Sequence, residues 1–176
     1  CIQLREKELN DEDFLAEALE IAALCKRYDV SFIINDHVDI AIQSKADGIH
    51  VGQEDMPVAQ VREKVGNDMI IGVSVSSPEE ALEAVRNGAD YLGVGSMFST
   101  STKLDVNILS KKTLSEICTA VDVPVVAIGG ISKANISQLS CTGVDGVALV
   151  SAIFSAENIE DECRLLRSLS EKMVNA

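Results

Sequence analysis

Three segments of the sequence repeat one short pattern that ends a helix-like stretch with a small residue and then opens a β-branched or aromatic run. The segments are Lys45–Ile49 (KADGI), Asn87–Tyr91 (NGADY) and Thr142–Val147 (TGVDGV). Gly and Asn are typical of helix ends, and a pattern that recurs along a chain indicates one repeated supersecondary unit. The recurrence therefore restricts the chain to a fold built from repeated helix and strand pairs.

The rest of the sequence shows the same alternation, which is typical of α/β proteins. We predict seven strands, over Cys1–Arg5, Ser31–Asp36, Gly48–Val51, Met69–Val75, Tyr91–Gly95, Val123–Ile128 and Gly146–Val150. Helices are predicted over Asp13–Tyr28, Val38–Lys45, Val58–Val65, Pro78–Arg86, Leu109–Val121, Ile136–Leu139 and Ile159–Met173.

Continuously apolar strands such as VPVVAI and GVALV predict a sheet that is covered on both faces. A doubly wound sheet and a TIM (β/α)8 barrel both provide this, and seven near-identical units without a switch pattern favour the barrel. A barrel needs eight strands, whereas the chain opens inside a strand. We therefore expect residues 1–176 to form a single barrel domain that lacks its first β/α unit.

Composition and charge exclude several classes of function. The 176 residues are 47% hydrophobic, enough for one core, and 15 Lys and Arg against 28 Asp and Glu give a net charge of −13. Such a surface repels nucleic acid and anionic membranes. The five cysteines are odd in number and show no CxxC spacing, so we expect reduced thiols and a cytoplasmic protein. Membrane spans are not expected, since no apolar run approaches about 18 residues.

Two aspartates follow consecutive predicted strands. In a parallel barrel the residues after the strands converge on one face, and adjacent strands lie about 5 Å apart, so Asp36 and Asp55 can face the same small volume. Oxygen ligands of this kind suit Mg²⁺. Either aspartate could instead cap the helix that follows it.

Cations on the same face suggest that the protein binds a diphosphate. Arg5, Lys7 and Lys103 could hold such an anion within an acidic protein, although each could equally be a solvated surface charge. The loop Ser99–Lys103 carries four hydroxyls and a cation, which indicates either a phosphate clamp or a solvated loop.

A second anion site is predicted near the C-terminus. Gly129 and Gly130 follow the next-to-last strand and Ser151 follows the last, where such barrels commonly bind phosphate, although Gly-Gly can be a simple turn. Two anion sites indicate a two-substrate transfer reaction. We expect His37 and His50 to serve structural or supporting roles.

Several strings resemble thiamine-phosphate synthases over essentially the whole chain. They include QLREK (3–7), GIHVGQEDMP (48–57), GVSV (72–75), YLGVGSMFSTSTK (91–103), VVAIGGI (125–131) and GVALVSAIF (146–154). The resemblance implies an Mg²⁺-dependent transferase that joins hydroxymethylpyrimidine diphosphate to thiazole phosphate, giving thiamine phosphate and pyrophosphate. It also implies a dissociative mechanism, in which a pyrimidinylmethyl cation is captured by the thiazole nitrogen.

The resemblance assigns roles residue by residue. It places Gln3, Arg5, Lys7 and Asn35 on the pyrimidine diphosphate, Asp36 and Asp55 on Mg²⁺, Ser74, Thr100, Thr102 and Lys103 on the pyrophosphate, and Gly130, Val150 and Ser151 on the thiazole phosphate. Arg5, Ser74 and Lys103 are the implied catalytic groups.

Three alternatives remain open. The related thiazole tautomerase has a His shortly after its fifth strand, where this chain has Ser76 and Ser77, and it lacks the TSTK loop. The other two are a non-catalytic barrel that binds thiamine precursors and a different phosphate-binding barrel. Retention of both aspartates and Lys103 favours an enzyme. A homo-oligomer, or a fusion to a kinase of the thiamine pathway, is compatible with the sequence.

Overall fold

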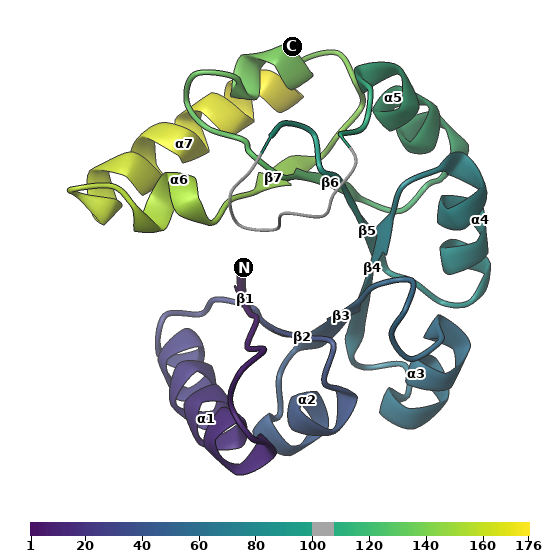
Figure 1. Cartoon of the computed structure of the whole chain (residues 1–176), viewed down its shortest axis with the longest axis vertical. Coiled ribbons are helices and arrows are strands. Elements are labelled where there is room, and N and C mark those ends of the chain that lie inside the picture. Colours follow the sequence, from purple (N-terminus) through teal and green to yellow (C-terminus); the bar gives the residue numbers. More distant parts are fainter. Residues whose placement is uncertain (100–107) are drawn as a thin grey trace. The chain divides into compact units, whose positions relative to one another are not determined.

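The predicted alternation of strands and helices is present in the computed structural model, which describes residues 1–99 and 108–176 (Figure 1). The chain divides into two compact units. The first unit comprises residues 1–74 and 86–90, and the second comprises residues 75–85 and 91–176.

The first unit is a parallel sheet covered by helices. Its elements are β1 (Ile2–Leu4), α1 (Asp11–Arg27), β2 (Phe32–Asn35), α2 (Val38–Ser44), β3 (Gly48–Val51), α3 (Val58–Val65) and β4 (Ile70–Val75), the last residue of which belongs to the second unit. The strands pair in chain order, and helices α1, α2 and α3 lie along one side of them (Figure 1). Ile34, Ile49 and Ile71 are fully buried in its core.

The second unit repeats this arrangement. It contains α4 (Pro78–Arg86, except its last residue), β5 (Tyr91–Val94), α5 (Lys111–Ala120), β6 (Val125–Ile128), the 3-10 helix η1 (Ile136–Leu139), β7 (Gly146–Ala148), α6 (Ser151–Phe154) and α7 (Ile159–Val174). Strands β5, β6 and β7 pair in parallel and in chain order. Leu92, Leu114, Ile136 and Leu166 are buried in its core.

The Asp of the repeated pattern has a structural role, because it forms two hydrogen bonds to one residue near the start of the preceding strand. The Asp N–H donates to a strand carbonyl, and its carboxylate accepts the N–H of the same residue. The pairs are Asp47 with Phe32, Asp90 with Ile71 and Asp145 with Val125, at 2.9, 2.8 and 2.9 Å for the first bond and 2.7, 2.7 and 2.8 Å for the second. Asp47 and Asp145 thus fix where β3 begins beside β2 and where β7 begins beside β6, and Asp90 fixes residues 86–90 against β4 within the first unit.

Helix boundaries differ from the prediction by a few residues because of caps. The first helix begins at Asp11 rather than Asp13, since the Asn10 side chain accepts the Asp13 N–H. Helix α5 begins after Ser110, whose hydroxyl accepts the Thr113 N–H. Helix α6 is a four-residue element that the sequence pattern did not predict.

The Arg62 side chain joins α3 to the two glycine turns of the first unit. One guanidinium nitrogen donates to the carbonyls of Gly66 and Met69 at 2.7 and 2.9 Å, and the other donates to the Gly88 carbonyl and the Asp90 carboxylate at 2.8 and 2.6 Å. The Arg62 side chain is only 19% exposed, so these bonds are partly shielded from water.

We expect Arg62→Ala to lower the free energy of unfolding by roughly 2–4 kcal/mol, because it removes charge-assisted bonds from partly buried acceptors. Lys64→Ala on the same helix is the matched control. The Lys64 ammonium lies 3.3 Å from Asp39 on an exposed surface, and such pairs contribute about 1 kcal/mol or less. Urea unfolding measures both variants, and equal losses would contradict the role given to Arg62.

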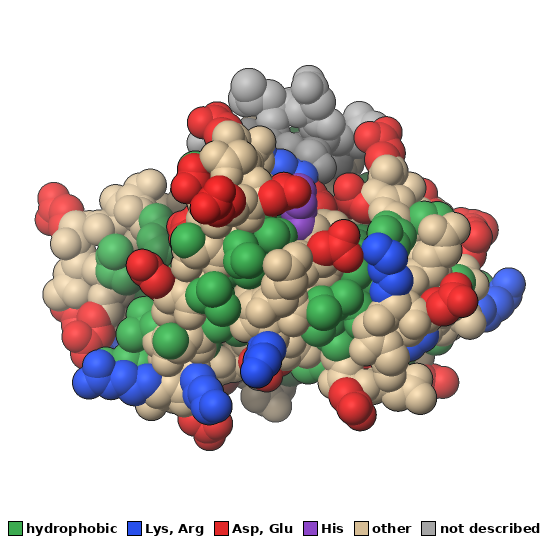
Figure 2. All heavy atoms as spheres, turned by 90° about the horizontal axis from the view of Figure 1, so that it is seen from below, with side chains coloured by type: hydrophobic (Ala, Val, Ile, Leu, Met, Phe, Trp, Pro, Cys, Tyr) green, Lys and Arg blue, Asp and Glu red, His purple; other side chains and the backbone are tan. Residues whose placement is uncertain are grey.

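The surface agrees with the charge of the sequence. On the face drawn in Figure 2, Lys and Arg side chains are separated from one another by acidic, apolar and other residues. None of the described helices is long and apolar enough to cross a membrane. All five cysteines lie in the described ranges, and each is a free thiol.

Candidate active site

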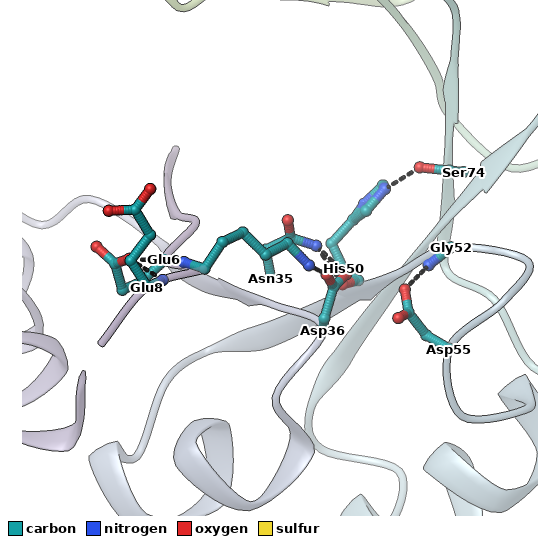
Figure 3. A network of polar contacts seen from close by, with 9 residues as sticks. Glu6, Glu8, Asn35, Asp36, His50, Gly52, Asp55 and Ser74 are labelled. Carbon is teal, nitrogen blue, oxygen red and sulfur yellow. Dashed lines mark hydrogen bonds and ion pairs between the residues drawn. The ribbon is translucent and has the colours of Figure 1, made fainter. Parts of the chain in front are cut away.

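A polar network gathers at the carboxyl end of β2 in the first unit (Figure 3). The Lys7 ammonium forms an ion pair with one Asp36 carboxylate oxygen, and the Asn35 amide donates to the other. The same amide donates to the His50 carbonyl at 3.1 Å, and the Asp36 N–H donates to that carbonyl at 2.8 Å. Asp36 is therefore held by three residues, Lys7, Asn35 and His50, the last of which belongs to the adjacent strand β3.

The backbone turns sharply at Asp36. Its φ of +66° lies in the left-handed region, which costs a residue with a side chain roughly 1–2 kcal/mol, although Asp and Asn tolerate it best. Such conformations cluster at functional sites, where the surrounding contacts hold them in place. Here the contacts with Lys7, Asn35 and His50 hold the turn.

Asp55 lies in the turn after β3, and its Oδ2 accepts the Gly52 N–H at 2.7 Å. Its carboxylate faces that of Asp36 closely enough to affect its ionisation (Figure 3). Burial raises the pKa of the Asp36 carboxyl, the Lys7 ammonium lowers it, and the Asp55 carboxylate raises it again. The two acidic groups thus oppose each other's negative charge.

This pair fits a magnesium ion. Mg²⁺ is usually bound by one or two carboxylates together with waters and substrate phosphate oxygens, and a divalent cation relieves the repulsion between the pair. Within the described ranges, no cluster of three or more His, Cys, Asp or Glu residues could form an all-protein metal cage. The donor chemistry therefore suits a metal that shares its coordination with a substrate.

Ser74 lies near the end of β4 and is held at two points from the β3 side. The His50 Nε2 lies 2.9 Å from the Ser74 hydroxyl, and the Gln53 amide donates to the Ser74 carbonyl at 2.7 Å. Burial lowers the pKa of His50 to about 4, so its imidazole is neutral near pH 7. Sequence reasoning gave neither His50 nor Gln53 a defined contact, although both stand in the string GIHVGQEDMP.

The segment after β1 carries the remaining candidates of this unit. The Glu6 carboxylate accepts the N–H groups of Lys7 and Glu8 at 2.6 and 2.7 Å, which folds the backbone around Lys7. Gln3 and Arg5 are exposed, and neither belongs to the network around Asp36.

In the second unit, the turn Gly129–Gly130 lies against the backbone that follows β5. The Phe98 N–H donates to the Gly129 carbonyl at 3.0 Å, and the Asn135 amide donates to the Gly130 carbonyl at 2.9 Å. Both glycines have positive φ, +98° and +62°. A Cβ at Gly129 would lie 2.0 Å from the Ser96 hydroxyl oxygen, and a Cβ at Gly130 would lie 2.3 Å from the Ser99 carbonyl oxygen. Glycine is therefore required at both positions.

The other predicted phosphate ligands lie beyond β7. Strands β6 and β7 pair with Ile128 opposite Ala148, so Gly130, Val150 and Ser151 all follow the same ends of two adjacent strands. The prediction placed Val150 inside the last strand, which instead ends at Ala148; Val150 precedes α6, and Ser151 is its first residue. Thr100, Thr102 and Lys103 lie outside the described residues.

Comparison with known proteins identifies the family of this chain. Residues 1–153 match the family model described as thiamine monophosphate synthase. A thiamine-phosphate synthase of Clostridium acetobutylicum is 48% identical over 171 residues, 97% of this chain and 81% of that protein. One of Clostridioides difficile is 52% identical over 161 residues, 92% of this chain and 77% of that protein.

A solved structure is also similar. Thiamine phosphate pyrophosphorylase from Pyrococcus furiosus superposes with a TM-score of 0.90 at 40% identity, covering 98% of this chain and 83% of that one. These similarities show that the chain belongs to the thiamine monophosphate synthase family.

Proposed function

We propose that the protein is a thiamine-phosphate synthase, which joins hydroxymethylpyrimidine diphosphate to thiazole phosphate and releases pyrophosphate. The observation that carries the proposal is the pair Asp36 and Asp55, facing each other beside Lys7 in a chain of this family. The tautomerase and the non-catalytic barrel are less well supported, since neither requires two opposed carboxylates.

The pyrimidine diphosphate would bind to the first unit. Gln3 and Asn35 would contact the pyrimidine substrate, and Arg5 and Lys7 would contact its diphosphate. On binding, Lys7 would exchange part of its ion pair with Asp36 for phosphate oxygens. The Ser74 hydroxyl, exposed at the end of β4, would donate to the same diphosphate.

Magnesium would be held by Asp36 and Asp55, and it would supply positive charge to the departing pyrophosphate. As the C–O bond to the diphosphate breaks, its electron pair leaves with pyrophosphate. The thiazole nitrogen then forms the new C–N bond to the pyrimidinylmethyl carbon. Arg5 and Ser74 would stabilise the leaving group as its charge develops.

The thiazole phosphate would bind to the second unit, at Gly130, Val150 and Ser151. The supporting observations are the Gly129–Gly130 turn, whose Gly130 carbonyl accepts the Asn135 amide, and the common end of β6 and β7 from which these residues continue. On the resemblance alone, Thr100, Thr102 and Lys103 would also contact the pyrophosphate.

A TIM (β/α)8 barrel formed as one domain is part of the same proposal. Its support is the parallel, chain-order pairing within each unit and the likeness to the solved pyrophosphorylase. The proposed partners are the two small-molecule substrates.

The direct test is pyrophosphate release by the purified protein. We expect release only when both substrates and Mg²⁺ are present, and a fall to background when the metal is chelated. A folded protein that binds either substrate and releases no pyrophosphate would refute the synthase and favour a binding protein.

A further inference from the structure

His50 is a buried residue with a specific geometric relation to Ser74. His50 is 8% exposed and stands on β3, and its backbone lies opposite Gly72 of β4. Ser74 is two residues further along β4 and therefore on the same face of the sheet. The imidazole Nε2 reaches its hydroxyl at 2.9 Å (Figure 3).

The rest of Ser74 is fixed as well. The Gln53 amide donates to its carbonyl at 2.7 Å, so both the backbone and the hydroxyl of this exposed serine are held from β3 and the turn after it. A serine that merely lay on the surface would have a freely rotating hydroxyl. The contact with His50 therefore restrains the direction of the hydroxyl.

The direction depends on which imidazole nitrogen carries the proton. A serine hydroxyl has one hydrogen and two lone pairs, and a diphosphate oxygen only accepts hydrogen bonds. If Nε2 accepts the serine hydrogen, Ser74 presents lone pairs to the anion, which is unfavourable. If Nε2–H donates to Oγ, the serine hydrogen is left to point at the anion.

We propose that His50 is a positioning residue whose Nε2–H donates to Ser74 Oγ and directs the serine hydrogen toward the leaving pyrophosphate. The inference rests on the proposed function, because it assigns Ser74 a diphosphate oxygen as its acceptor. It requires a proton on Nε2 in the folded protein, a property that can be measured without any substrate.

Variants of His50 and Ser74 test the proposal through kcat and KM for pyrophosphate release. His50→Leu removes the donor, and we expect it to lower kcat/KM about 10- to 100-fold, as expected for loss of a hydrogen bond to a charged group. Most of the loss should fall on kcat, because the bond strengthens as charge develops on pyrophosphate. His50→Gln keeps an amide donor at a similar reach and should recover much of the activity.

The double variant separates positioning from packing. If His50 acts through Ser74, then His50→Leu combined with Ser74→Ala should be no less active than Ser74→Ala alone. Independent losses that multiply, or a His50→Leu enzyme with the activity of the unsubstituted protein, would overturn the proposal. Thermal unfolding of each variant identifies any that fail to fold.

Nitrogen NMR of the unsubstituted protein keeps the proposal testable if His50→Leu does not fold. The chain has two histidines, so a His37→Gln variant assigns the His50 signals. A proton on Nδ1 in place of Nε2 would overturn the inference. Absence of pyrophosphate release by the unsubstituted protein would instead refute the proposed function, and the two failures are thus distinguishable.

Discussion

Asp55→Asn is expected to lower kcat/KM for pyrophosphate release by about 10³-fold or more while leaving the fold intact. The substitution preserves the shape of the side chain and removes its charge. A bound metal contributes several kcal/mol of charge stabilisation to a transition state, and each 1.36 kcal/mol corresponds to about tenfold in rate. Loss of one of only two protein carboxylates should therefore remove most of this contribution.

The position of Asp55 makes a mainly structural effect small. Its side chain accepts the Gly52 N–H, and the oxygen of an Asn side chain can still accept that N–H. Removing its charge also takes away the repulsion that raises the pKa of Asp36. In the absence of metal, Asp55→Asn should then be at least as stable as the unsubstituted protein.

A neighbouring acid provides the matched control. Glu54→Gln removes the same charge one residue away, from an exposed side chain, and should leave kcat/KM within about twofold because exposed charges interact weakly. Addition of Mg²⁺ with pyrophosphate should raise the unfolding temperature of the protein and of Glu54→Gln, and should do so much less for Asp55→Asn. Equal activity of the two variants would contradict the metal role of Asp55.

The order of strands and helices could be predicted because local patterns determine it. Apolar β-branched runs and helical spacing are properties of short segments. Each of the seven predicted strands is therefore present in the described part of the chain, with ends that differ by a few residues. The repeated KADGI-type pattern was also recognised. The cause of the pattern could not be predicted, because the two hydrogen bonds between Asp145 and Val125 join residues 20 positions apart, which no local pattern reveals.

The first-unit site was predicted in part. The positions of Asp36 and Asp55 after adjacent parallel strands predicted that their carboxylates lie close together, and the two carboxylates do interact. Their binding of a metal stays a prediction. The left-handed turn at Asp36 and the orientation of His50 toward Ser74 could not be predicted. Both depend on the register of three strands, which decides which side chain of each strand faces which neighbour.

The Gly-Gly turn shows a different limit of sequence reasoning. From the sequence, Gly129 and Gly130 could be explained as a phosphate-binding loop or as a simple turn. The structure adds a third explanation, because the backbone after β5 approaches both glycines too closely for a side chain to fit. Hydrogen bonds reinforce the approach, with the Met97 N–H donating to the Ile128 carbonyl at 2.9 Å.

Gly129→Ala is accordingly expected to lower the free energy of unfolding by roughly 2–5 kcal/mol, the sum of a left-handed residue at about 1–2 and overpacking at about 1–3. Its Cβ would lie 2.0 Å from the Ser96 hydroxyl and 2.7 Å from the Ser96 Cα, and Ser96 is itself buried. Relief of the clash with Ser96 requires displacement of the backbone that follows β5. We therefore also expect weaker binding of inorganic phosphate to variant protein that remains folded.

Substitutions at two other glycines separate the contribution of the backbone conformation to the lost free energy of unfolding from that of overpacking. Gly66→Ala adds a methyl group at a φ of +73° with nothing within 4 Å, so its loss measures the backbone conformation alone. Gly146→Ala adds a methyl group in open space without a positive φ, and should change stability by less than about 0.5 kcal/mol. Thermal and urea unfolding should rank the losses Gly129, then Gly66, then Gly146. A Gly129→Ala protein as stable as Gly66→Ala would show that the close approach to Ser96 relaxes at little expense, and the turn would then be explained by its conformation alone.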